Sequence, residues 1–555
     1  MYAIDVISMR MPKKRIAILG LITAILLGVA ATVDQDKYFE IIKNIEIFTN
    51  VYKEVNASYV DGTDPSKLMK TGIDAMLASL DPFTNYFSEA QVEDYRLSTE
   101  GKYNGIGAKG KKMGNSVVIT EVYKDYPAFK AGLRVGDQIL AVNGLDAKDK
   151  QAEDLYQIMR GIPKSEVTVT VLRPGSKEKQ NIKLVRDEVN IPNVPYSGMV
   201  DSEIGYVILT TFTENAGRNV QSAVNKLKNE NPGLKGIIFD LRENGGGLLG
   251  EAVQVCNTFV PGGNLIVSTR GKEKEYNASY KTMTPAVDEN IPLVVLINKN
   301  SASASEIVSG TMQDLDRAIL IGQLSYGKGL VQNTKETGYN SRVKFTTAKY
   351  YIPSGRCIQS VKYENGIRVH LPDSLRSAFK TKNGRTVYDG GGVQPDIEMK
   401  ETEYPEIVQK LMDGNWIFNY VTGYCLAHTE EHDPKTYKFT DFDDFVNYLK
   451  KNAFEDSSAL EKKLNLFAEE LGRQKRQDFN QDIERLKNKL DQDQWEGIRA
   501  HKELITHVLE EEIVSRTGYE SGRLLNRLQY DPLIKKAAEV LKSPAEYNRI
   551  LAKKG

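Results

Sequence analysis

Three serines separated only by alanines follow an apolar run near the middle of the 555-residue chain. The run at residues 293–297 predicts a buried strand, and the segment from Asn298 to Glu306 is expected to lead into a helix. Minimal side chains there would let a substrate backbone reach a hydroxyl at the helix N-terminus, where the dipole stabilises negative charge. Ser303 is therefore a candidate nucleophile. Ser303 and Glu306 also have the spacing of a capping box, and the spacing alone favours that structural role.

A serine nucleophile needs a general base, and no histidine lies near this segment. All five histidines lie after residue 369, at positions 370, 428, 432, 501 and 507. A lysine can replace histidine if burial keeps its amine neutral. Lys328 lies between two glycines ahead of β-prone residues, and Gln332 would share its strand face and orient the amine. By itself, a Gly-Lys-Gly sequence is more often a surface turn.

A glycine triplet, Gly245 to Gly247, follows a second expected strand at residues 236–241. Glycines let the backbone approach a ligand closely and direct N–H groups at it, which suits an anion or an oxyanion hole. In open α/β sheets, ligands bind beyond the carboxyl ends of the strands, where both loops are expected. A single glycine triplet is nevertheless more often a plain tight turn.

Other patterns exclude several classes of protein. His428-Thr429-Glu430-Glu431-His432 matches an inverted zinc-peptidase pattern, but Asp433-Pro434 would end the helix that must present both histidines. The three cysteines are scattered and lack the spacing of a disulfide framework or a zinc site, so neither metal nor cofactor is expected. The 74 basic and 74 acidic residues leave no net charge, which argues against a nucleic-acid partner.

The chain must contain several domains to position these residues. Its length suggests three to four, and 40% hydrophobic with 27% charged residues is ordinary for a soluble globular protein. Disorder as the main state and a polytopic membrane protein are therefore excluded. Basic residues between 10 and 15 precede an uncharged apolar run at 16–33, so residues 1–33 predict an export signal or, at 18 apolar residues, an uncleaved membrane anchor.

Sequence periodicity divides the remainder into four regions. Residues 34–100 are expected to be helical, whereas 101–187 contain short β-rich runs punctuated by glycines, with one helix. Residues 188–400 alternate strands and helices, as in an α/β domain with a largely parallel sheet. Residues 401–555 are charged and amphipathic, typical of a solvated helical domain; a partner-docking surface is the alternative.

In their order along residues 38–400, the motifs of this chain resemble those of the carboxy-terminal processing (tail-specific) proteases, which are exported serine peptidases with a PDZ domain and a Ser–Lys site. The motifs are Ser79-Leu80-Asp81-Pro82 with Tyr86, Gly105-Ile106-Gly107, Pro127 through Asn143-Gly144, Asp240-Leu241-Arg242 with Gly246-Gly247, Ser301 to Glu306, Gly327-Lys328-Gly329 with Gln332, Tyr351-Ile352-Pro353-Ser354-Gly355-Arg356, and Gly392-Val393-Gln394-Pro395-Asp396. Most are weak alone, but together they are highly specific. The resemblance implies a multidomain α/β fold: a ClpP/crotonase-like peptidase core, a small mostly-β PDZ domain and flanking helical regions.

The resemblance also implies roles for single residues. The catalytic residues would be Ser303 as nucleophile, Lys328 as general base, Gln332 as its positioning partner and Glu306 as support for the site. This overturns the capping role of the Ser303 hydroxyl, because a hydroxyl committed to a cap would not attack. Backbone N–H groups of Gly246 and Ala304 would form the oxyanion hole.

In the PDZ domain, the residues implied to grip a substrate carboxylate are Gly105, Ile106 and Gly107, while the peptide adds as a β-strand. Arg160 matches a position expected to communicate with the active site. The 401–555 region lies outside the common core of the family. A resting structure with Lys328 turned away from Ser303 would be compatible with this enzyme class.

The predicted function is that of a serine endopeptidase of the periplasm or cell envelope that recognises protein C-termini. Its partners would be protein or peptide substrates with accessible C-termini, with membrane contact only through an uncleaved N-terminal segment; a homo-oligomer is compatible with the sequence. One alternative is a non-catalytic PDZ adaptor on a degenerate peptidase scaffold, against which the intact Ser303, Lys328 and Gln332 argue. The other alternative is a different acyl-handling enzyme on a related α/β scaffold, and the PDZ-like region argues against it.

Overall fold

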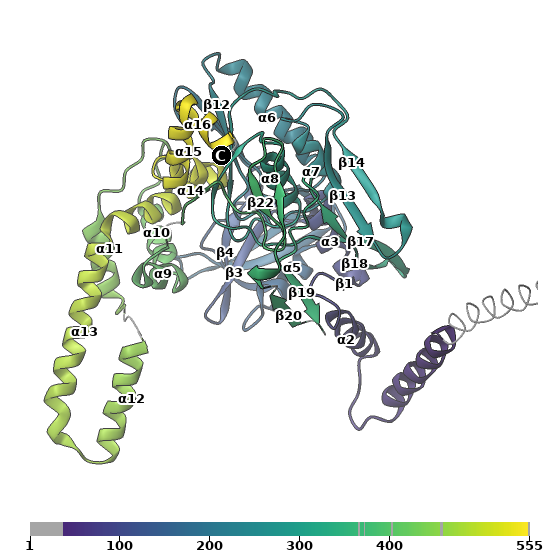
Figure 1. The fold of residues 1–555 in the computed structure, drawn as a ribbon. Helices are drawn as coiled ribbons and strands as arrows, with labels where there is room; N and C mark the ends of the chain where they lie inside the picture. The colour runs from purple at the N-terminus through teal and green to yellow at the C-terminus, as the bar shows by residue number, and fades with distance from the viewer. Residues whose placement is uncertain (1–36, 365–366, 371, 401–402, 455–458, 553–555) are drawn as a thin grey trace, which may run out of the picture. The chain divides into compact units, whose positions relative to one another are not determined.

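The computed structural model describes residues 37–364, 367–370, 372–400, 403–454 and 459–552 (Figure 1). The chain forms two compact units that divide after Leu80. The predicted signal or anchor at residues 1–33 lies outside the described residues. Among the helices of the described part, none combines the length and apolar character that a membrane span requires.

The first unit consists of two helices. Residues 37–58 are helical, and α2 spans Pro65–Ala78. The sequence predicts a helix start at Asp64-Pro65, and this is confirmed: the Asp64 carboxylate accepts the Lys67 N–H, 3.1 Å away, as an N-cap. The Tyr52 hydroxyl donates to the Pro65 carbonyl, 2.9 Å away, and so joins the two helices.

The second unit begins with β1 (Asn85–Phe87) and α3 (Val92–Glu100), followed by a small β domain. Its antiparallel sheet has the order β3-β4-β5-β7-β8, with β6 beside β5. Its elements are β2 (Lys102–Gly105), β3 (Ala108–Met113), β4 (Ser116–Val122), α4 (Pro127–Lys130), β5 (Gln138–Val142), β6 (Leu145–Asp146), α5 (Ala152–Met159), β7 (Glu166–Leu172), β8 (Lys179–Val185) and β9 (Asp187–Asn190). Alternating valines and isoleucines of β4 and β7 contribute to its core, as period-two patterning requires.

The central sheet of the second unit has six strands in the order β10-β11-β12-β15-β16-β23. Only β10 is antiparallel to its neighbour. The strands are β10 (Tyr196–Met199), β11 (Ile204–Ile208), β12 (Gly236–Asp240), β15 (Leu293–Ile297), β16 (Ile319–Gly322) and β23 (Ile397–Glu398). The largely parallel sheet predicted for this region is confirmed. Every residue of β11, β12 and β15 is buried, because helices cover both faces.

The two faces of this sheet are covered by helices from different parts of the chain. One face packs against α6 (Ala216–Glu230), α7 (Leu249–Cys256) and α8 (Ala304–Asp314). The other packs against α15 (Pro532–Lys542) and α16 (Pro544–Leu551). The end of the predicted helical region at residues 401–555 therefore packs directly on the central sheet.

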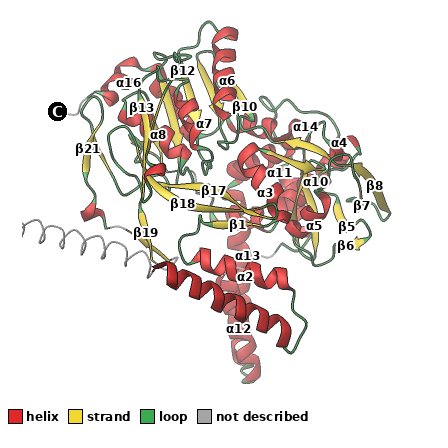
Figure 2. Ribbon diagram, turned by 90° about the vertical axis from the view of Figure 1, so that its right-hand side faces the viewer, coloured by secondary structure: helices red, strands yellow, loops and turns green. Residues whose placement is uncertain are grey.

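A second, antiparallel sheet lies next to the central one. Its strand order is β1-β18-β13-β14, and β17 also pairs with β18. The two long strands β17 and β18 run side by side in Figure 2. The strands are β13 (Leu265–Gly271), β14 (Ala278–Lys281), β17 (Leu330–Gly338) and β18 (Ser341–Tyr351). Two small ribbons follow, β19 (Val361–Glu364) with β20 (Ile367–His370) and β21 (Ala378–Lys380) with β22 (Thr386–Tyr388). Short 3₁₀ turns lie at Glu89–Gln91, Lys274–Tyr276, Asp373–Leu375 and Gln477–Phe479.

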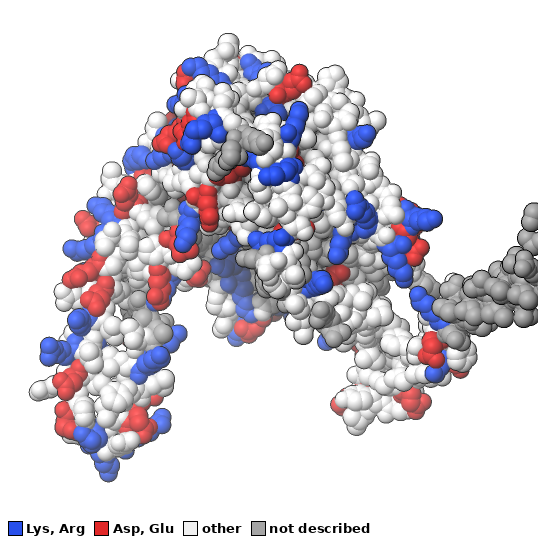
Figure 3. All heavy atoms as spheres, viewed as in Figure 1, with Lys and Arg blue, Asp and Glu red and all other residues white. Residues whose placement is uncertain are grey.

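The rest of the C-terminal region is helical, as predicted. Its helices are α9 (Glu406–Asp413), α10 (Trp416–Ala427), α11 (Phe442–Lys451), α12 (Ala459–Arg473), α13 (Asn480–Ala500) and α14 (Lys502–Arg527). The helices α12 and α13 form a hairpin, over which side chains of both charges are interspersed (Figure 3). Because α10 ends at Ala427, His428 and His432 lie in a loop and not on one helix. Within the described ranges, no group of three histidine, cysteine or acidic side chains is placed to hold a metal ion.

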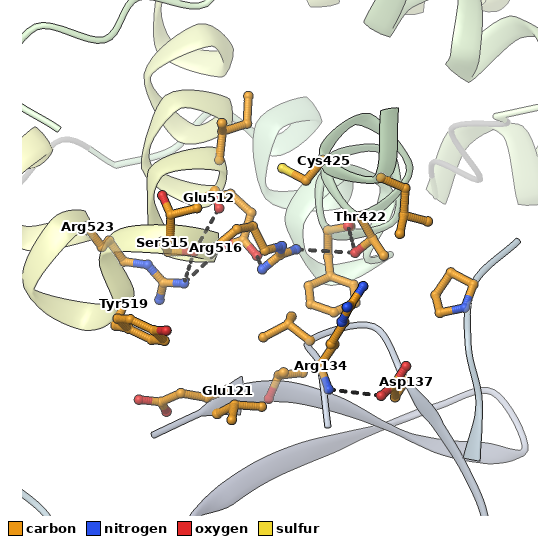
Figure 4. Close-up of a pocket in the computed structure, with 18 of the residues that line it drawn as sticks. Glu121, Arg134, Asp137, Thr422, Cys425, Glu512, Ser515, Arg516, Tyr519 and Arg523 are labelled. Carbon is orange, nitrogen blue, oxygen red and sulfur yellow. Dashed lines mark hydrogen bonds and ion pairs between the residues drawn. The ribbon is translucent and has the colours of Figure 1, made fainter. Parts of the chain in front are cut away.

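The small β domain faces α10 and α14 across a cavity of about 780 Å³ (Figure 4). Arg516 of α14 donates to Glu512 (2.7 Å) and to Thr422 of α10 (3.3 Å), so this wall of the cavity is fixed by polar contacts. Phe129 of the β domain packs edge-on against Tyr519, where α14 is kinked. None of the residues that line this cavity belongs to the loops that carry the candidate catalytic residues.

Candidate active site

Ser303 is the N-cap residue of α8 and lies directly beyond the carboxyl end of β15. Its backbone has φ 56° and ψ −112°, an unusual conformation for a residue other than glycine and one that is often found at functional sites. The flanking Ser301 and Ser305 are fully buried, and their hydroxyls donate to the carbonyls of Leu241 (2.8 Å) and Asn244 (2.7 Å). Ser303 alone of the three is partly exposed.

Glu306 connects the serine loop with the lysine loop. The side chain is fully buried, and one carboxylate oxygen accepts the N–H groups of Ser303 (2.8 Å) and Lys328 (2.9 Å). The other oxygen accepts the Ser325 hydroxyl (2.5 Å) and the Gly327 N–H (2.6 Å). Burial raises the pKa of Glu306, although these four hydrogen bonds oppose the shift. The carboxylate of the predicted capping box is thus present, and it also fixes the position of Lys328.

The Lys328 amine is largely buried. Burial, together with repulsion from Lys344, lowers its pKa to about 8, and Asp81 and Glu306 only partly oppose this. The amine nitrogen lies 4.1 Å from the centre of the Phe83 ring. In the described part of the chain, no hydrogen bond joins this amine to the Ser303 hydroxyl. In these described segments the predicted nucleophile and base are therefore on adjoining loops that Glu306 connects, without a hydrogen bond between their side chains.

Phe83 is held over the amine by the turn that begins the second unit. The Asp81 carboxylate accepts the Phe83 N–H (2.9 Å) and the Thr84 hydroxyl (3.1 Å). The Thr84 oxygen in turn accepts the N–H of Thr346 on β18 (3.3 Å). Sequence reasoning did not assign a function to this turn, and only its match to the family motif pointed to it.

Gln332 lies on β17 but contacts a different partner from the one predicted. Its side-chain amide donates to the Thr346 hydroxyl, 3.1 Å away. Lys328 precedes β17, which begins at Leu330, and the pairing of β17 with β18 is irregular between Val331 and Gln332. The expectation that Lys328 and Gln332 share one face of a regular strand is therefore wrong, because the strand starts later and contains an irregularity.

Gly246 lies against the nucleophile. Its φ is +101°, and a Cβ atom there would come within 2.8 Å of the Ser303 Cβ and 2.9 Å of the Ala304 nitrogen, so only glycine fits. Ala304 is the first residue of α8, where backbone N–H groups have no partner within the helix. The Gly246 N–H donates to the Asn244 side-chain oxygen, 2.9 Å away. The two predicted oxyanion donors are thus neighbours, and one of them is already hydrogen-bonded.

Asn244, which sequence reasoning did not single out, connects the two loops of the site. It is fully buried, and its backbone carbonyl accepts the Ala302 N–H (3.0 Å) as well as the Ser305 hydroxyl. Its side-chain amide donates to the Leu209 carbonyl (2.7 Å). The sequence signal that could have pointed to Asn244 is its position as a polar residue between the end of a buried strand and the glycine triplet.

Of the three residues predicted to bind a substrate carboxylate, Ile106 lines a small cavity of about 160 Å³ between α3, β3 and α5, and Gly105 and Gly107 are its neighbours in the chain. Gly107 has φ +78° and packs on Tyr126, so a side chain would not fit there. Tyr156 of α5 reaches across to β3, where its hydroxyl lies 2.7 Å from both the nitrogen and the oxygen of Gly110. Arg160 pairs with Asp94 of α3, which links the β domain to the segment before it.

Two of the family motifs form buried ion pairs and not catalytic contacts. Arg356 contacts Asp314 at 2.9 Å, at the C-terminal end of α8. Arg385 pairs with Asp316 (2.6 Å) and with Asp396. These pairs hold the end of α8 opposite Ser303.

Known protein families match three parts of the chain. Residues 118–173 match the PDZ domain, and residues 203–371 match the Peptidase family S41. Residues 407–541 match a family described as the C-terminal helical domain of probable PDZ-proteases.

Individual proteins are also similar to parts of this chain. A carboxy-terminal-processing protease of Bartonella bacilliformis is 35% identical over 353 residues, which cover 63% of this chain and 81% of that protein. A probable CtpA-like serine protease of Staphylococcus aureus is 34% identical, over 59% of this chain and 65% of that relative. Among solved structures, the photosystem II D1 C-terminal processing protease is 27% identical with a TM-score of 0.35, over 66% of this chain and 95% of that one. A peptide-bound PDZ domain of a Vibrio cholerae carboxy-terminal protease is 26% identical with a TM-score of 0.16, over 16% and 99% of the two chains.

Proposed function

Because this chain belongs to the family of carboxy-terminal-processing serine proteases, we propose that it cleaves peptide bonds by a Ser–Lys mechanism, with Ser303 as nucleophile and Lys328 as general base. The observation that carries the proposal is the buried Lys328 amine, whose pKa is lowered to about 8. A lysine with that pKa is partly neutral near pH 8 and can accept a proton from a hydroxyl. Glu306 holds its loop next to Ser303 through backbone hydrogen bonds.

The proposed reaction is an acyl transfer. Neutral Lys328 takes the proton of Ser303, and the serine oxygen attacks the scissile carbonyl to form a tetrahedral oxyanion. The N–H groups of Ala304 and Gly246 would stabilise that oxyanion, and one such donor typically contributes about 3 kcal/mol. Lys328 then gives its proton to the leaving amine, and water attacks the acyl-enzyme with Lys328 again as the base.

Two local changes are required before this reaction can proceed. The Lys328 amine must turn from the Phe83 ring towards Ser303, and the Gly246 N–H must leave the Asn244 side chain. Both changes involve single side chains or one peptide group, so we propose that a bound substrate completes the site. Gln332 would then hold the amine in its new position, in exchange for its contact with Thr346.

We further propose that the PDZ domain captures protein or peptide substrates by their C-termini and delivers them to Ser303. The glycine-containing loop at residues 105–107 and the position of β3 at the end of its sheet support this, because PDZ domains bind a terminal carboxylate and extend the peptide as a strand. A bound strand would replace the Tyr156 hydroxyl at Gly110. The proposed location is the periplasm or cell envelope. Its support is the basic and apolar pattern of residues 10–33, which would also supply the membrane contact if uncleaved.

Cleavage of an unstructured protein with a free C-terminus tests the mechanism. We expect wild type to cleave it and both Ser303→Ala and Lys328→Ala to lose about 10³-fold or more in kcat. Blocking the substrate C-terminus by amidation should raise KM if the PDZ domain captures it. Undiminished cleavage by either variant refutes the Ser–Lys assignment. Peptide binding without cleavage by wild type would instead support the adaptor alternative.

A further inference from the structure

Arg242 lies between two carboxylates, one two residues before it in the chain and the other in the C-terminal helical region. Its guanidinium contacts Asp240 at the end of β12 (2.6 Å) and Asp531 of the C-terminal helical region (2.8 Å). All three side chains are largely buried, with 13% of Arg242 and 7% of Asp531 exposed. Burial by itself would lower the pKa of Arg242, but the two carboxylates outweigh it and raise the pKa, so the arginine stays charged.

Asp531 is itself held firmly in place. It is the N-cap residue of α15, where its carboxylate also accepts the N–H groups of Leu533 (2.9 Å) and Ile534 (3.3 Å). The apolar side of α15 packs on the central sheet, where Leu541 lies against Gly236 at the start of β12. The helix therefore gives Arg242 a fixed anchor.

Arg242 belongs to the segment that forms one wall of the active site. On one side of it, the Leu241 carbonyl accepts the Ser301 hydroxyl. On the other side, the Asn244 carbonyl accepts the Ala302 N–H and the Ser305 hydroxyl, and the segment then reaches Gly246 beside Ser303. A shift at residue 242 would therefore move the glycine loop relative to the nucleophile.

We propose that Asp531 is a positioning residue for peptide-bond cleavage: through Arg242 it fixes the segment 240–246 and, with it, the Gly246 donor beside Ser303. The C-terminal helical region would thus contribute to transition-state stabilisation in addition to covering the sheet. This inference rests on the proposed function, because it takes Gly246 as part of the oxyanion hole. It assigns Asp531 no contact with substrate.

The substitution Asp531→Asn in the full-length chain isolates the contribution of the ion pair between Asp531 and Arg242. Asparagine is also a good N-cap residue, so α15 keeps its cap while Arg242 loses a carboxylate. We expect kcat to fall about 10- to 100-fold with KM within about twofold of wild type, since only transition-state contacts are displaced. Affinity for a peptidyl boronic acid, which forms a tetrahedral adduct with the serine, should fall by a similar factor.

Lys542→Gln is the matched control. It removes another ion pair between α15 and the core, Lys542 with Asp201 (2.7 Å), which does not involve the segment 240–246. We expect the kcat of Lys542→Gln to equal that of wild type. If Lys542→Gln loses as much kcat as Asp531→Asn, the effect is general docking of α15, and the inference is wrong.

The remaining outcomes separate this inference from the proposed function. If Asp531→Asn keeps the kcat and the boronate affinity of wild type while Ser303→Ala is inactive, the positioning role of Asp531 is wrong and the proposed function stands. Full activity in Ser303→Ala overturns the proposed function itself. If Asp531→Asn fails to fold, Arg242→Lys tests the inference instead. Lysine keeps the positive charge but lacks the planar guanidinium that contacts both carboxylates, so we expect the same loss of kcat. Wild-type kcat in Arg242→Lys would overturn the inference.

Discussion

The Lys328 amine lies 4.1 Å from the centre of the Phe83 ring, so the general base of the proposed mechanism rests on an aromatic face. An aromatic face attracts a charged ammonium, by about 0.5–2 kcal/mol depending on burial. The ring thus favours the protonated lysine, whereas burial and Lys344 favour the neutral amine. Burial and Lys344, opposed by Asp81 and Glu306, lower the pKa of Lys328 to about 8.

Phe83→Leu should therefore make the enzyme more active at neutral pH. Leucine keeps the site apolar but removes the ring face, so the pKa of Lys328 should fall further and the amine should leave its resting position more easily. We expect kcat/KM at pH 7 to rise about two- to tenfold, measured on an unstructured protein substrate. Phe83→Tyr, which keeps the ring face, is the control and should resemble wild type. A loss of activity in Phe83→Leu would mean that the ring supports the active position of Lys328.

The pH dependence of kcat/KM should report the protonation of Lys328 directly. The charged amine is inactive as a base, so activity should rise with pH, with a midpoint near the lysine pKa of about 8, and level off above it. Lys344 repels the ammonium and lowers this pKa, so Lys344→Gln should move the midpoint to higher pH. Lys349→Gln, at an exposed position of the same strand, should leave it unchanged. A midpoint that stays at its wild-type value in Lys344→Gln would contradict the assignment of the base.

Glu306→Gln should damage both folding and activity. Each carboxylate oxygen accepts two donors, so the NH₂ group of glutamine would face two N–H or O–H groups in a fully buried site. We expect a loss of about 2–4 kcal/mol in the free energy of unfolding and of at least about 10²-fold in kcat. Thermal unfolding and steady-state kinetics measure the two effects. Glu336→Gln, at an exposed position on β17, should change neither; an active and stable Glu306→Gln would show that the two loops are held together by other contacts.

Local sequence patterns predicted the elements of the site better than its contacts. The buried strand before Ser303 and the helix after it follow from an apolar run and a capping signal, and both are present. The strand-parity argument for Lys328 and Gln332 failed, because an irregular strand cannot be recognised from residue spacing. The pairing of Arg242 with Asp531 was equally invisible, because it joins segments far apart in the chain and only the folded sheet brings them together. Lys328 itself came from the resemblance to a family, since Gly-Lys-Gly alone indicates a turn.

Lys328→Met should be inactive but more stable than wild type at neutral pH. The pKa of Lys328 is about 8 in the folded protein and about 10.4 in an unfolded chain, so folding disfavours the charged amine. Wild type is therefore destabilised, by up to about 3 kcal/mol, at pH values below the folded pKa, and the penalty shrinks as pH rises from about 8 to about 10.4. Methionine has no charge to bury. Thermal unfolding of both proteins should show a higher Tm for Lys328→Met at pH 7 and a smaller difference at pH 10. A difference in Tm that is constant with pH would show that the substitution acts through packing. A difference in Tm that depends on pH would identify the buried amine as a feature that the fold retains for catalysis at the expense of stability.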